Sequence, residues 1–549
     1  MRHLLLSRSR AIAIALPGLI VAAGLAAVAG CADPAAIAEG EDQELIAGTC
    51  KVTIQKTGKA MTATQMKALK DPVAELVLLA AGGCPTSFDE IQAKLRKTDT
   101  VNCKNDPAAP PAGTATRFVT ERGQVLKRAD SFRAVVSRSC NGRSNHELLM
   151  SLFGIGADPA KLPQDVELIG FDKTAGVFNY YAREENKWTF FGSSKDLIGD
   201  GYNCDSVGAC VPKAASKTRC ASCHLGGGLI IKEFDSPWVH WEHNTTTVGA
   251  QELLTKHKMT LGSQKDDGAG LESTVRNGNR IWNRTRVDFL KTKGVAELLR
   301  PLFCTVDLNL QSGSTSTDTV PSSVRGDFLL EPRLSSFDSV PIDSADYTAL
   351  AAANGQAVKD SSKTPLKDKD GKAVTDTIFA WTYPERGQAD MDYVNALVEK
   401  NVIDDDFAND ILSIDFTRPI FSGKRCALLA HAPTLAAAAM TPQGIRDGFK
   451  AKLTAAATKT PELTALLAKL GDVADTAKHK DAATKYLTAC KARPKKEFLA
   501  DALAWSGQLR RQTHKSVGLV EFAEAMVSDK FDAATTDFRT FDPVTCTLK

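Results

Sequence analysis

Three short runs of apolar, aromatic and β-branched residues lie close together between positions 166 and 191. They are VELIGF at 166–171, VFNYYAR at 177–183 and KWTFF at 187–191, and short polar turns separate them. Residues of this kind favour extended backbone, and turns at this spacing connect antiparallel strands. We therefore predict one strand followed by a β-hairpin.

Helical patterns flank these strands on both sides. Near the N-terminus a helix is predicted from Asp71 to Gly82, and SFDE at 87–90 has the spacing of a capping box for the next helix. In the last third, leucines follow the i, i+3, i+4, i+7 pattern of an amphipathic helix over residues 461–471. Further helices are predicted at 434–440, 497–511 and 517–527.

These patterns predict a mainly α protein with a minor β element, which is an α+β fold. Polar or Pro-rich stretches at 107–114, 311–326 and 354–376 indicate linkers or loops. A chain of 549 residues is long enough for several domains at roughly 150 residues each. We divide it into an N-terminal leader (1–30), a small helical region with its linker (31–112), a central domain (113–310), polar loops (311–376) and a helical C-terminal domain (377–549).

The leader has the form of an export signal. Its basic start, MRHLLLSRSR, precedes an apolar run at 11–28 that carries no charge. The run ends in VAGC, which resembles the lipobox of bacterial lipoproteins, and the resemblance implies lipid on Cys31 and a membrane anchor there. An ordinary signal peptide or a single membrane span is the alternative, although the run is marginal for a span of about 20 residues.

Lipidation at Cys31 implies a place in the bacterial cell envelope, as a periplasm-facing or surface lipoprotein. Ala32 follows this cysteine where the inner-membrane sorting rule of enteric bacteria has Asp. By resemblance to that rule, the outer membrane is favoured.

Export changes the interpretation of the 13 cysteines, because disulfides persist outside the cytosol. Setting aside Cys31 and the pair Cys220 and Cys223 leaves an even number, which predicts five disulfides. Cys204 and Cys210 are close enough in the sequence to close a small loop. The other pairings stay open. The alternative is that some of these cysteines are buried free thiols. The ten are Cys50, Cys84, Cys103, Cys140, Cys204, Cys210, Cys304, Cys426, Cys490 and Cys546.

The net charge of the chain does not indicate a nucleic-acid partner. The chain has 68 basic and 65 acidic residues, and removal of the three arginines of the leader leaves the two signs equal. The basic stretch 117–143 and the acidic stretch 404–415 are interpreted as solvated faces. No G-x-S-x-G, H-E-x-x-H or P-loop motif is present, so hydrolase and nucleotide-binding functions lack a starting point.

The chemistry concentrates in TRCASCHLGGG at 218–228, which contains a C-x-x-C-H motif. Zinc needs about four ligands, and Cys204 and Cys210 could join Cys220 and Cys223, but the spacing is loose and an oxidising compartment opposes free thiolates. A thioredoxin-like redox pair expects a helix unbroken by glycine after the motif, whereas three glycines follow here.

Covalent haem uses every residue of the motif. The thiols of Cys220 and Cys223 can add to the two vinyl groups of one porphyrin, and His224 then becomes the axial ligand of the iron. Gly226 and Gly227 have no Cβ, so the backbone can turn sharply and pass close to a flat cofactor.

The segment CASCH resembles the signature of c-type cytochromes. With WTFFGSS before it and SPWVHWEH after it, the chain over residues 165–243 resembles large single-haem cytochrome c domain lipoproteins of bacteria. The resemblance implies one haem c in a cytochrome c-like domain at 113–310, with a short hairpin. Dihaem peroxidases and dihaem rubber oxygenases have two such motifs and this chain has one, so their catalysis does not carry over.

The sixth ligand of the iron stays open. Four residues downstream of the motif carry an atom that could ligate the iron. The alternative is that none of the four does so, because each can instead serve in packing or hydrogen bonding. The four are Met259, His240, His243 and His257. Candidate walls of the haem pocket are Trp188, Tyr181, Trp238 and Trp241, which can equally be core residues.

Three functions follow, in order of preference. The first is an exported, lipid-anchored cytochrome that passes single electrons to a redox protein partner. The second is a haem enzyme of peroxidase or oxygenase type with an open distal side, for which this length supplies ample scaffold. The third is a binding or structural lipoprotein whose haem is incidental.

Overall fold

The structure is a computed structural model. It describes residues 50–80, 83–95, 113–121, 131–140, 143–155, 166–184, 187–216, 219–222, 224–229, 241–242, 269–311, 322–334, 338–354, 371, 383–471, 476–517 and 539–549. The predicted leader, Cys31 and the linker at 107–112 lie outside these residues. Among them, no helix combines the length and the apolar character needed to cross a membrane.

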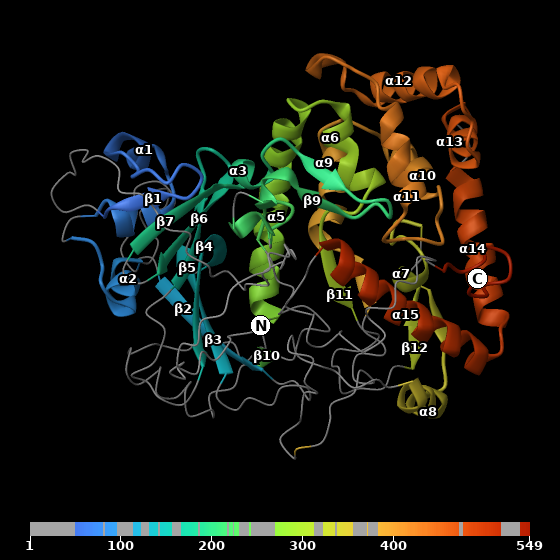
Figure 1. Cartoon of the computed structure of the whole chain (residues 1–549), viewed down its shortest axis with the longest axis horizontal. Coiled ribbons are helices and arrows are strands. Elements are labelled where there is room, and N and C mark those ends of the chain that lie inside the picture. Colours follow the sequence, from blue (N-terminus) through green and yellow to red (C-terminus); the bar gives the residue numbers. More distant parts are fainter. Residues whose placement is uncertain are drawn as a thin grey trace, which may run out of the picture.

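The largest β element of the described chain is an eight-stranded sheet in the order β1-β7-β6-β5-β4-β3-β2-β10 (Figure 1). All neighbours are antiparallel except β1 and β7, which pair in parallel. The strands are β1 (Val52–Ile54), β2 (Gly113–Glu121), β3 (Ser131–Cys140), β4 (Arg143–Ile155), β5 (Val166–Asp172), β6 (Val177–Glu184), β7 (Lys187–Ser193) and β10 (Trp241–Glu242).

The predicted strand and hairpin are confirmed as β5, β6 and β7, and the α+β class is confirmed. The β part is larger than that prediction, because β2, β3 and β4 extend the sheet. The basic stretch 117–143 runs through these strands. Charged and polar residues interrupt β2 and β3, so neither reads as a continuous apolar run, whereas the apolar run LLMSLFGI at 148–155 in β4 was passed over in the prediction.

Helices make up most of the rest. They are α1 (Ala63–Ala68), η1 (Ala74–Leu78), α2 (Phe88–Leu95), α3 (Ser194–Ile198), η3 (Lys213–Ser216), η4 (Arg219–Ser222), α5 (Ala269–Lys291), α6 (Val295–Phe303), α7 (Gly326–Leu329), α8 (Ser344–Asn354), α9 (Gln388–Glu399), α10 (Asp405–Leu412), α11 (Gly423–Ala427), η6 (Leu428–His431), η7 (Ala437–Ala439), α12 (Pro442–Ala455), α13 (Pro461–Gly471), α14 (Thr476–Ala492) and α15 (Lys495–Val517). Three short antiparallel pairs complete the described elements: β8 (Tyr202–Cys204) with β9 (Cys210–Pro212), β11 (Leu308–Gln311) with β14 (Tyr383–Arg386), and β12 (Ser323–Arg325) with β13 (Ser339–Pro341).

The predicted helices at 461–471 and 497–511 are confirmed as α13 and as part of α15. Leu463, Leu466 and Leu470 of α13 are buried, as the pattern requires. The helix predicted at 434–440 is wrong, because only the short turn η7 forms there. Its alanine side chains are exposed and bury no apolar face that would stabilise a helix. The helix predicted at 517–527 begins at the last residue of α15, and its remainder lies outside the described residues.

The N-terminal helices begin where the caps predict. The amides of Val73 and Ala74 donate to Asp71 Oδ1, although the helix that follows is the short π-helix η1, which ends at Leu78. Ser87 Oγ accepts from the amide of Glu90 at the start of α2. The caps were readable because they are local in sequence.

Two buried cores lie on opposite faces of the sheet. The small core joins η1, α1 and α2 to one face, and Tyr181 of β6 belongs to it. The large core takes Phe178, Tyr180 and Ala182 from the other face of β6 and continues through α5 and α6 to Leu548. Figure 1 shows α5 between the sheet and the C-terminal helices. Strand side chains alternate between faces, so neighbouring tyrosines of β6 enter different cores.

Eight of the ten cysteines form four disulfides, as the prediction that these ten cysteines are paired requires. They are Cys50–Cys84, Cys204–Cys210, Cys304–Cys426 and Cys490–Cys546, and the first closes the small core. The predicted small loop between Cys204 and Cys210 is confirmed. Cys103 and the side chain of Cys140 lie outside the described part, so the fifth disulfide stays a prediction.

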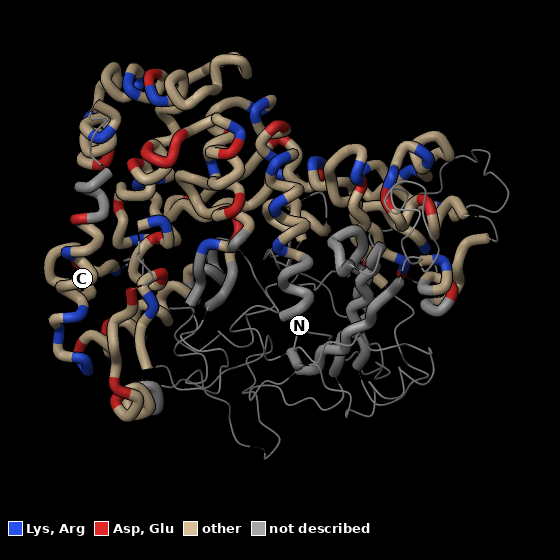
Figure 2. Tube along the Cα trace, turned by 180° about the vertical axis from the view of Figure 1, so that it is seen from behind, with Lys and Arg blue, Asp and Glu red and all other residues tan. Residues whose placement is uncertain are grey.

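Basic and acidic residues are interspersed along the described helices and loops (Figure 2). This distribution agrees with the equal numbers of the two signs expected after removal of the leader. It gives no extended field of one sign that would attract a polyanion.

Candidate functional site

The C-x-x-C-H motif lies at the short turn η4, between the sheet and α5. The amide of His224 donates to the carbonyl oxygen of Cys220 at 2.8 Å, so these two residues sit one helical turn apart. Cys220 is half-buried and takes part in none of the four disulfides, while Cys223 lies outside the described residues.

His224 is held in a defined tautomer. Its Nδ1 lies 2.7 Å from the carbonyl oxygen of Gly228, and a ring nitrogen that meets a carbonyl oxygen must carry the proton. The lone pair of the neutral ring is then on Nε2, the atom through which a histidine of this tautomer would ligate a metal. Metal-ligating histidines are commonly oriented by such a bond to backbone. The donor chemistry of His224 and Cys220 therefore fits the group that the motif predicts.

The loop that carries this carbonyl is fixed by three buried side chains. Trp282 Nε1 donates to the oxygen of Gly226 at 2.8 Å. The hydroxyl of Tyr180 lies 3.0 and 2.9 Å from the oxygens of Gly227 and Gly228. Asn279 bonds both the amide and the oxygen of Leu229, at 2.8 and 3.1 Å. The position of the His224 acceptor is thus set by β6 and α5.

The glycines are explained by contacts with protein. Gly227 has φ +67°, and a Cβ there would lie 2.7 Å from the oxygen of Ser194. A Cβ on Gly228 would lie 2.4 Å from Asn279 Oδ1, and one on Gly226 would press on Arg286. Their described role is to let the loop lie against α3 and α5. Haem contact by Gly226 and Gly227 stays a prediction.

A buried charged network lies behind the loop. Arg286 of α5 is fully buried; its Nη2 donates to the hydroxyl of Tyr202 at 2.9 Å and lies 3.9 Å from Asp390 Oδ1. Its guanidinium stacks over the ring of Tyr393, 4.6 Å from the centroid. Asp390 Oδ2 accepts from the backbone amides of residues 306 and 307. Burial raises the pKa of Asp390 to about 6, although Arg386 and Arg286 lower it.

This network was missed in the sequence. One signal for part of it exists, because Asn279, Asn283 and Arg286 recur at i, i+4 and i+7 and so form a polar stripe along α5. Asn283 Nδ2 donates to the oxygen of Ala389 on α9. A polar stripe on a long helix indicates either solvent or a buried network, and here the three side chains are buried.

Two of the predicted pocket walls are wrong. Tyr181 and Trp188 belong to the small core, on the face of the sheet away from His224. The tyrosine beside His224 is Tyr180, with ring centroids 4.8 Å apart. The other candidates are not tested: Trp238, His240, His243, His257 and Met259 lie outside the described residues, as does the side chain of Trp241.

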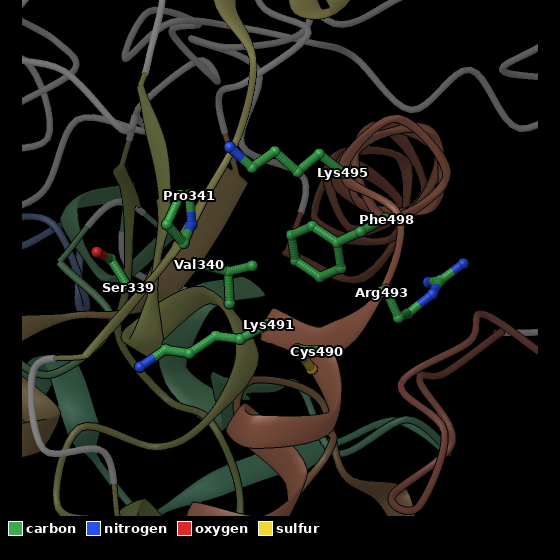
Figure 3. A pocket seen from close by; sticks show the side chains of 8 residues that line it. All are labelled: Ser339, Val340, Pro341, Cys490, Lys491, Arg493, Lys495 and Phe498. Carbon is green, nitrogen blue, oxygen red and sulfur yellow. The ribbon is translucent and has the colours of Figure 1, made fainter.

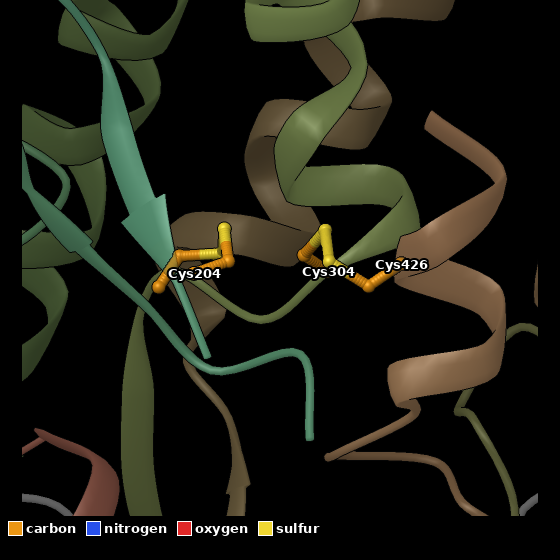
Figure 4. Close-up of side chains that lie close together, drawn as sticks. Cys204, Cys304 and Cys426 are labelled. Carbon is orange, nitrogen blue, oxygen red and sulfur yellow. A yellow bond between two sulfur atoms is a disulfide. The ribbon is translucent and has the colours of Figure 1, made fainter. Parts of the chain in front are cut away.

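The sulfur ligands proposed for a zinc site are in disulfides. The four sulfur atoms of Cys204, Cys210, Cys304 and Cys426 all lie within 4.8 Å of one another, as two adjacent disulfides (Figure 4). Sulfur bound in a disulfide is not a thiolate ligand. The two adjacent disulfides therefore lie where the β8–β9 hairpin meets α6 and α11. They do not support a zinc site that includes Cys220.

A pocket of about 300 Å³ lies far from the motif in sequence (Figure 3). It is lined by Ser339, Val340, Pro341, Cys490, Lys491, Arg493, Lys495 and Phe498. Lys491 is paired with Asp338 at 2.9 Å and Arg493 with Asp501 at 2.8 Å. Two of its three cations are thus already neutralised by neighbouring carboxylates.

Comparison of the chain with protein-family models, with curated proteins and with solved structures gives no match. The candidate function therefore depends on the motif and its geometry.

Proposed function

We propose that this protein is an exported, lipid-anchored c-type cytochrome that transfers single electrons to a redox protein partner. One haem is attached through Cys220 and Cys223, and His224 ligates its iron. The observation that carries the proposal is the bond from His224 Nδ1 to the oxygen of Gly228, at 2.7 Å. It puts the lone pair on Nε2, through which His224 would ligate the iron.

The residues of the chain have separate tasks in this proposal. The turn of η4 places Cys220 and His224 one helical turn apart, as attachment to one porphyrin and ligation of its iron require. Tyr180 and Asn279 fix the loop, so His224 is prevented from rotating. The haem, when bound, would supply the one-electron chemistry, and the buried loop after His224 would limit the access of water to it.

The location is part of the same proposal. The leader and the lipobox-like VAGC favour a lipid on Cys31 and the bacterial envelope, in the outer membrane or on the periplasmic side. The four described disulfides support an oxidising compartment. We likewise propose a cytochrome c-like domain within residues 113–310. Most strands of the eight-stranded sheet belong to the same range of residues.

The test is to produce the full chain in a bacterial host that attaches haem c, and to determine by mass spectrometry whether haem is bound covalently. Optical and electron-resonance spectra are then recorded with and without carbon monoxide. A low-spin iron that is indifferent to carbon monoxide is expected. A chain without covalent haem would overturn the proposal. A high-spin iron that binds carbon monoxide and consumes peroxide would replace the carrier with the enzyme.

Single variants assign the residues. His224→Ala should abolish the low-spin spectrum, whereas His431→Ala, in η6 and remote in sequence, should leave it unchanged. Met259→Leu and His240→Ala identify the sixth ligand by the loss of the same spectrum. Cys31→Ala should release the protein from the membrane fraction.

A further inference from the structure

One backbone oxygen beside His224 accepts two hydrogen bonds. The oxygen of Gly228 lies 2.7 Å from His224 Nδ1 and 2.9 Å from the hydroxyl of Tyr180. Tyr180 is 1 % exposed, and its ring lies against the His224 imidazole at a centroid distance of 4.8 Å. The tyrosine ring therefore packs against the histidine ring, and the two side chains share one acceptor.

We propose that Tyr180 is a positioning residue that sets the strength of the His224 hydrogen bond and, through it, the reduction potential of the iron. This inference rests on the proposed function. A carbonyl oxygen that already accepts from a hydroxyl is a weaker acceptor for the imidazole N–H. His224 then has less imidazolate character and gives less charge to the iron, which favours the ferrous state.

The hydroxyl is a dependable donor. A tyrosine hydroxyl carries one proton that it can donate. Two carbonyl oxygens lie within its reach, that of Gly228 at 2.9 Å and that of Gly227 at 3.0 Å. A carbonyl oxygen can only accept, so the one hydroxyl proton is donated toward these two oxygens, and the shorter contact is the one to Gly228.

The loop does not depend on Tyr180 alone. Trp282 holds Gly226, and Asn279 holds Leu229 through two bonds, so the loop is fixed on both sides of Gly228. Removal of one hydroxyl by Tyr180→Phe keeps the ring that packs on His224. The variant thus separates the hydrogen bond from the packing.

The experiment is a redox titration of the haem-loaded full chain. Tyr180→Phe should lower the midpoint potential, with a decrease of up to about tenfold in the ferrous-to-ferric ratio at a fixed potential, equivalent to about 59 mV for one electron. Tyr181→Phe is the matched control, because it makes the same change at the neighbouring residue, whose hydroxyl meets Asp71 in the small core. Its potential should equal that of the unaltered chain.

Two further measurements keep the test decisive. Incorporation of 3-fluorotyrosine at position 180 gives a stronger donor of nearly the same size, and the potential should rise, even if Tyr180→Phe fails to fold. In chain produced without haem, the proton chemical shift of His224 Nδ1–H, measured in a nitrogen-15-edited spectrum, should move downfield in Tyr180→Phe. The reason is that its hydrogen bond to the oxygen of Gly228 becomes stronger.

The outcomes separate the two proposals. An unchanged potential together with an unchanged Nδ1 proton in Tyr180→Phe overturns the role of Tyr180 and leaves the cytochrome standing. Equal shifts in Tyr180→Phe and Tyr181→Phe also overturn it, since they would report only a general perturbation of β6. Absence of covalent haem from the unaltered chain defeats the proposed function, and the proton shift still tests the shared acceptor.

Discussion

The two faces of β6 use adjacent tyrosines in the same way and for different ends. On one face, Asp71 accepts four hydrogen bonds, from the amides of Val73 and Ala74, from Asn179 Nδ2 and from the hydroxyl of Tyr181. On the other face, the oxygen of Gly228 accepts from Tyr180 and from a histidine. Each arrangement fixes a segment of backbone to the strand.

The two arrangements differ in the chemistry of the groups that donate the hydrogen bonds. All four donors to Asp71 are backbone or side-chain groups that fix the packing of the small core, and burial raises the pKa of this carboxyl. Such a buried acceptor with all its bonds made has a structural role, and we call it the Asp71 hub. The donor on the other face is a ring with a second nitrogen, so fixing Nδ1 of His224 also sets the position of Nε2. A polar hub indicates function when one of its members retains reactive capacity.

Removal of a disulfide gives the largest expected loss of stability in each of the two cores. Cys304–Cys426 joins residues 122 positions apart in the large core, and Cys50–Cys84 joins residues 34 apart in the small one. Replacement of both cysteines by alanine should lower the free energy of unfolding by about 5 kcal/mol in the first case and about 4 kcal/mol in the second, because loop-closure entropy grows slowly with separation. Denaturant titration followed by tryptophan fluorescence measures both.

The location of the loss distinguishes the cores. Without Cys50–Cys84, faster hydrogen exchange should be confined to β1, η1 and α2, and the haem spectrum should persist. Exchange that spreads equally through α5 would show that the two cores unfold as one unit.

Asp71→Ala should be the most damaging single substitution of the small core. It leaves the buried donors of Asn179 and Tyr181 without their acceptor, at a cost on the order of 4 kcal/mol. The midpoint potential should not change, since the hub has no described bond to the motif. Thermal unfolding and redox titration of the same sample check both parts, and a shifted potential would contradict the separation of the two faces.

The sequence predicted what is local and missed what depends on distant partners. The caps at Asp71 and Ser87, the strands β5 to β7 and the loop between Cys204 and Cys210 follow from neighbours within a few residues. The partners of Asp71 lie 108 and 110 positions away, so its hub was invisible.

The same limit applied to the site. Tyr180 and Tyr181 have nearly the same sequence context, and the core that each enters is decided by the register of β6 and by the segments packed on either face. The motif predicted the histidine, but the acceptor Gly228 and its second donor needed three-dimensional contacts.

The buried acid of the large core predicts a pH dependence. Asp390 has a pKa of about 6 in the fold against 3.8 in the unfolded chain, mainly because burial penalises its charge. The folded chain then binds the proton more tightly, so the free energy of unfolding should fall as pH rises from about 4 to about 6 and stay level above, by roughly 3 kcal/mol in all.

Asp390→Asn isolates this contribution. The amide oxygen can still accept from the backbone amides that Asp390 Oδ2 meets, and the group no longer titrates. The difference in unfolding free energy between the two chains should therefore slope between pH 4 and pH 6. A difference that is constant with pH would mean that Asp390 is charged throughout, as its neighbour Arg286 favours.

The smallest effects, and the sharpest comparison, come from two glycines. A Cβ at Gly170 would lie 2.4 Å from Asp71 Oδ1, and one at Gly228 would lie 2.4 Å from Asn279 Oδ1. Alanine at either position should cost about 1–3 kcal/mol through overpacking, measured by denaturant unfolding. Gly170→Ala should leave the haem spectrum and potential unchanged, whereas Gly228→Ala should alter both, because it moves the acceptor of His224. Equal effects of the two variants on the potential would show that the hub at Asp71 is coupled to the iron, and the two faces of β6 would then form one functional unit.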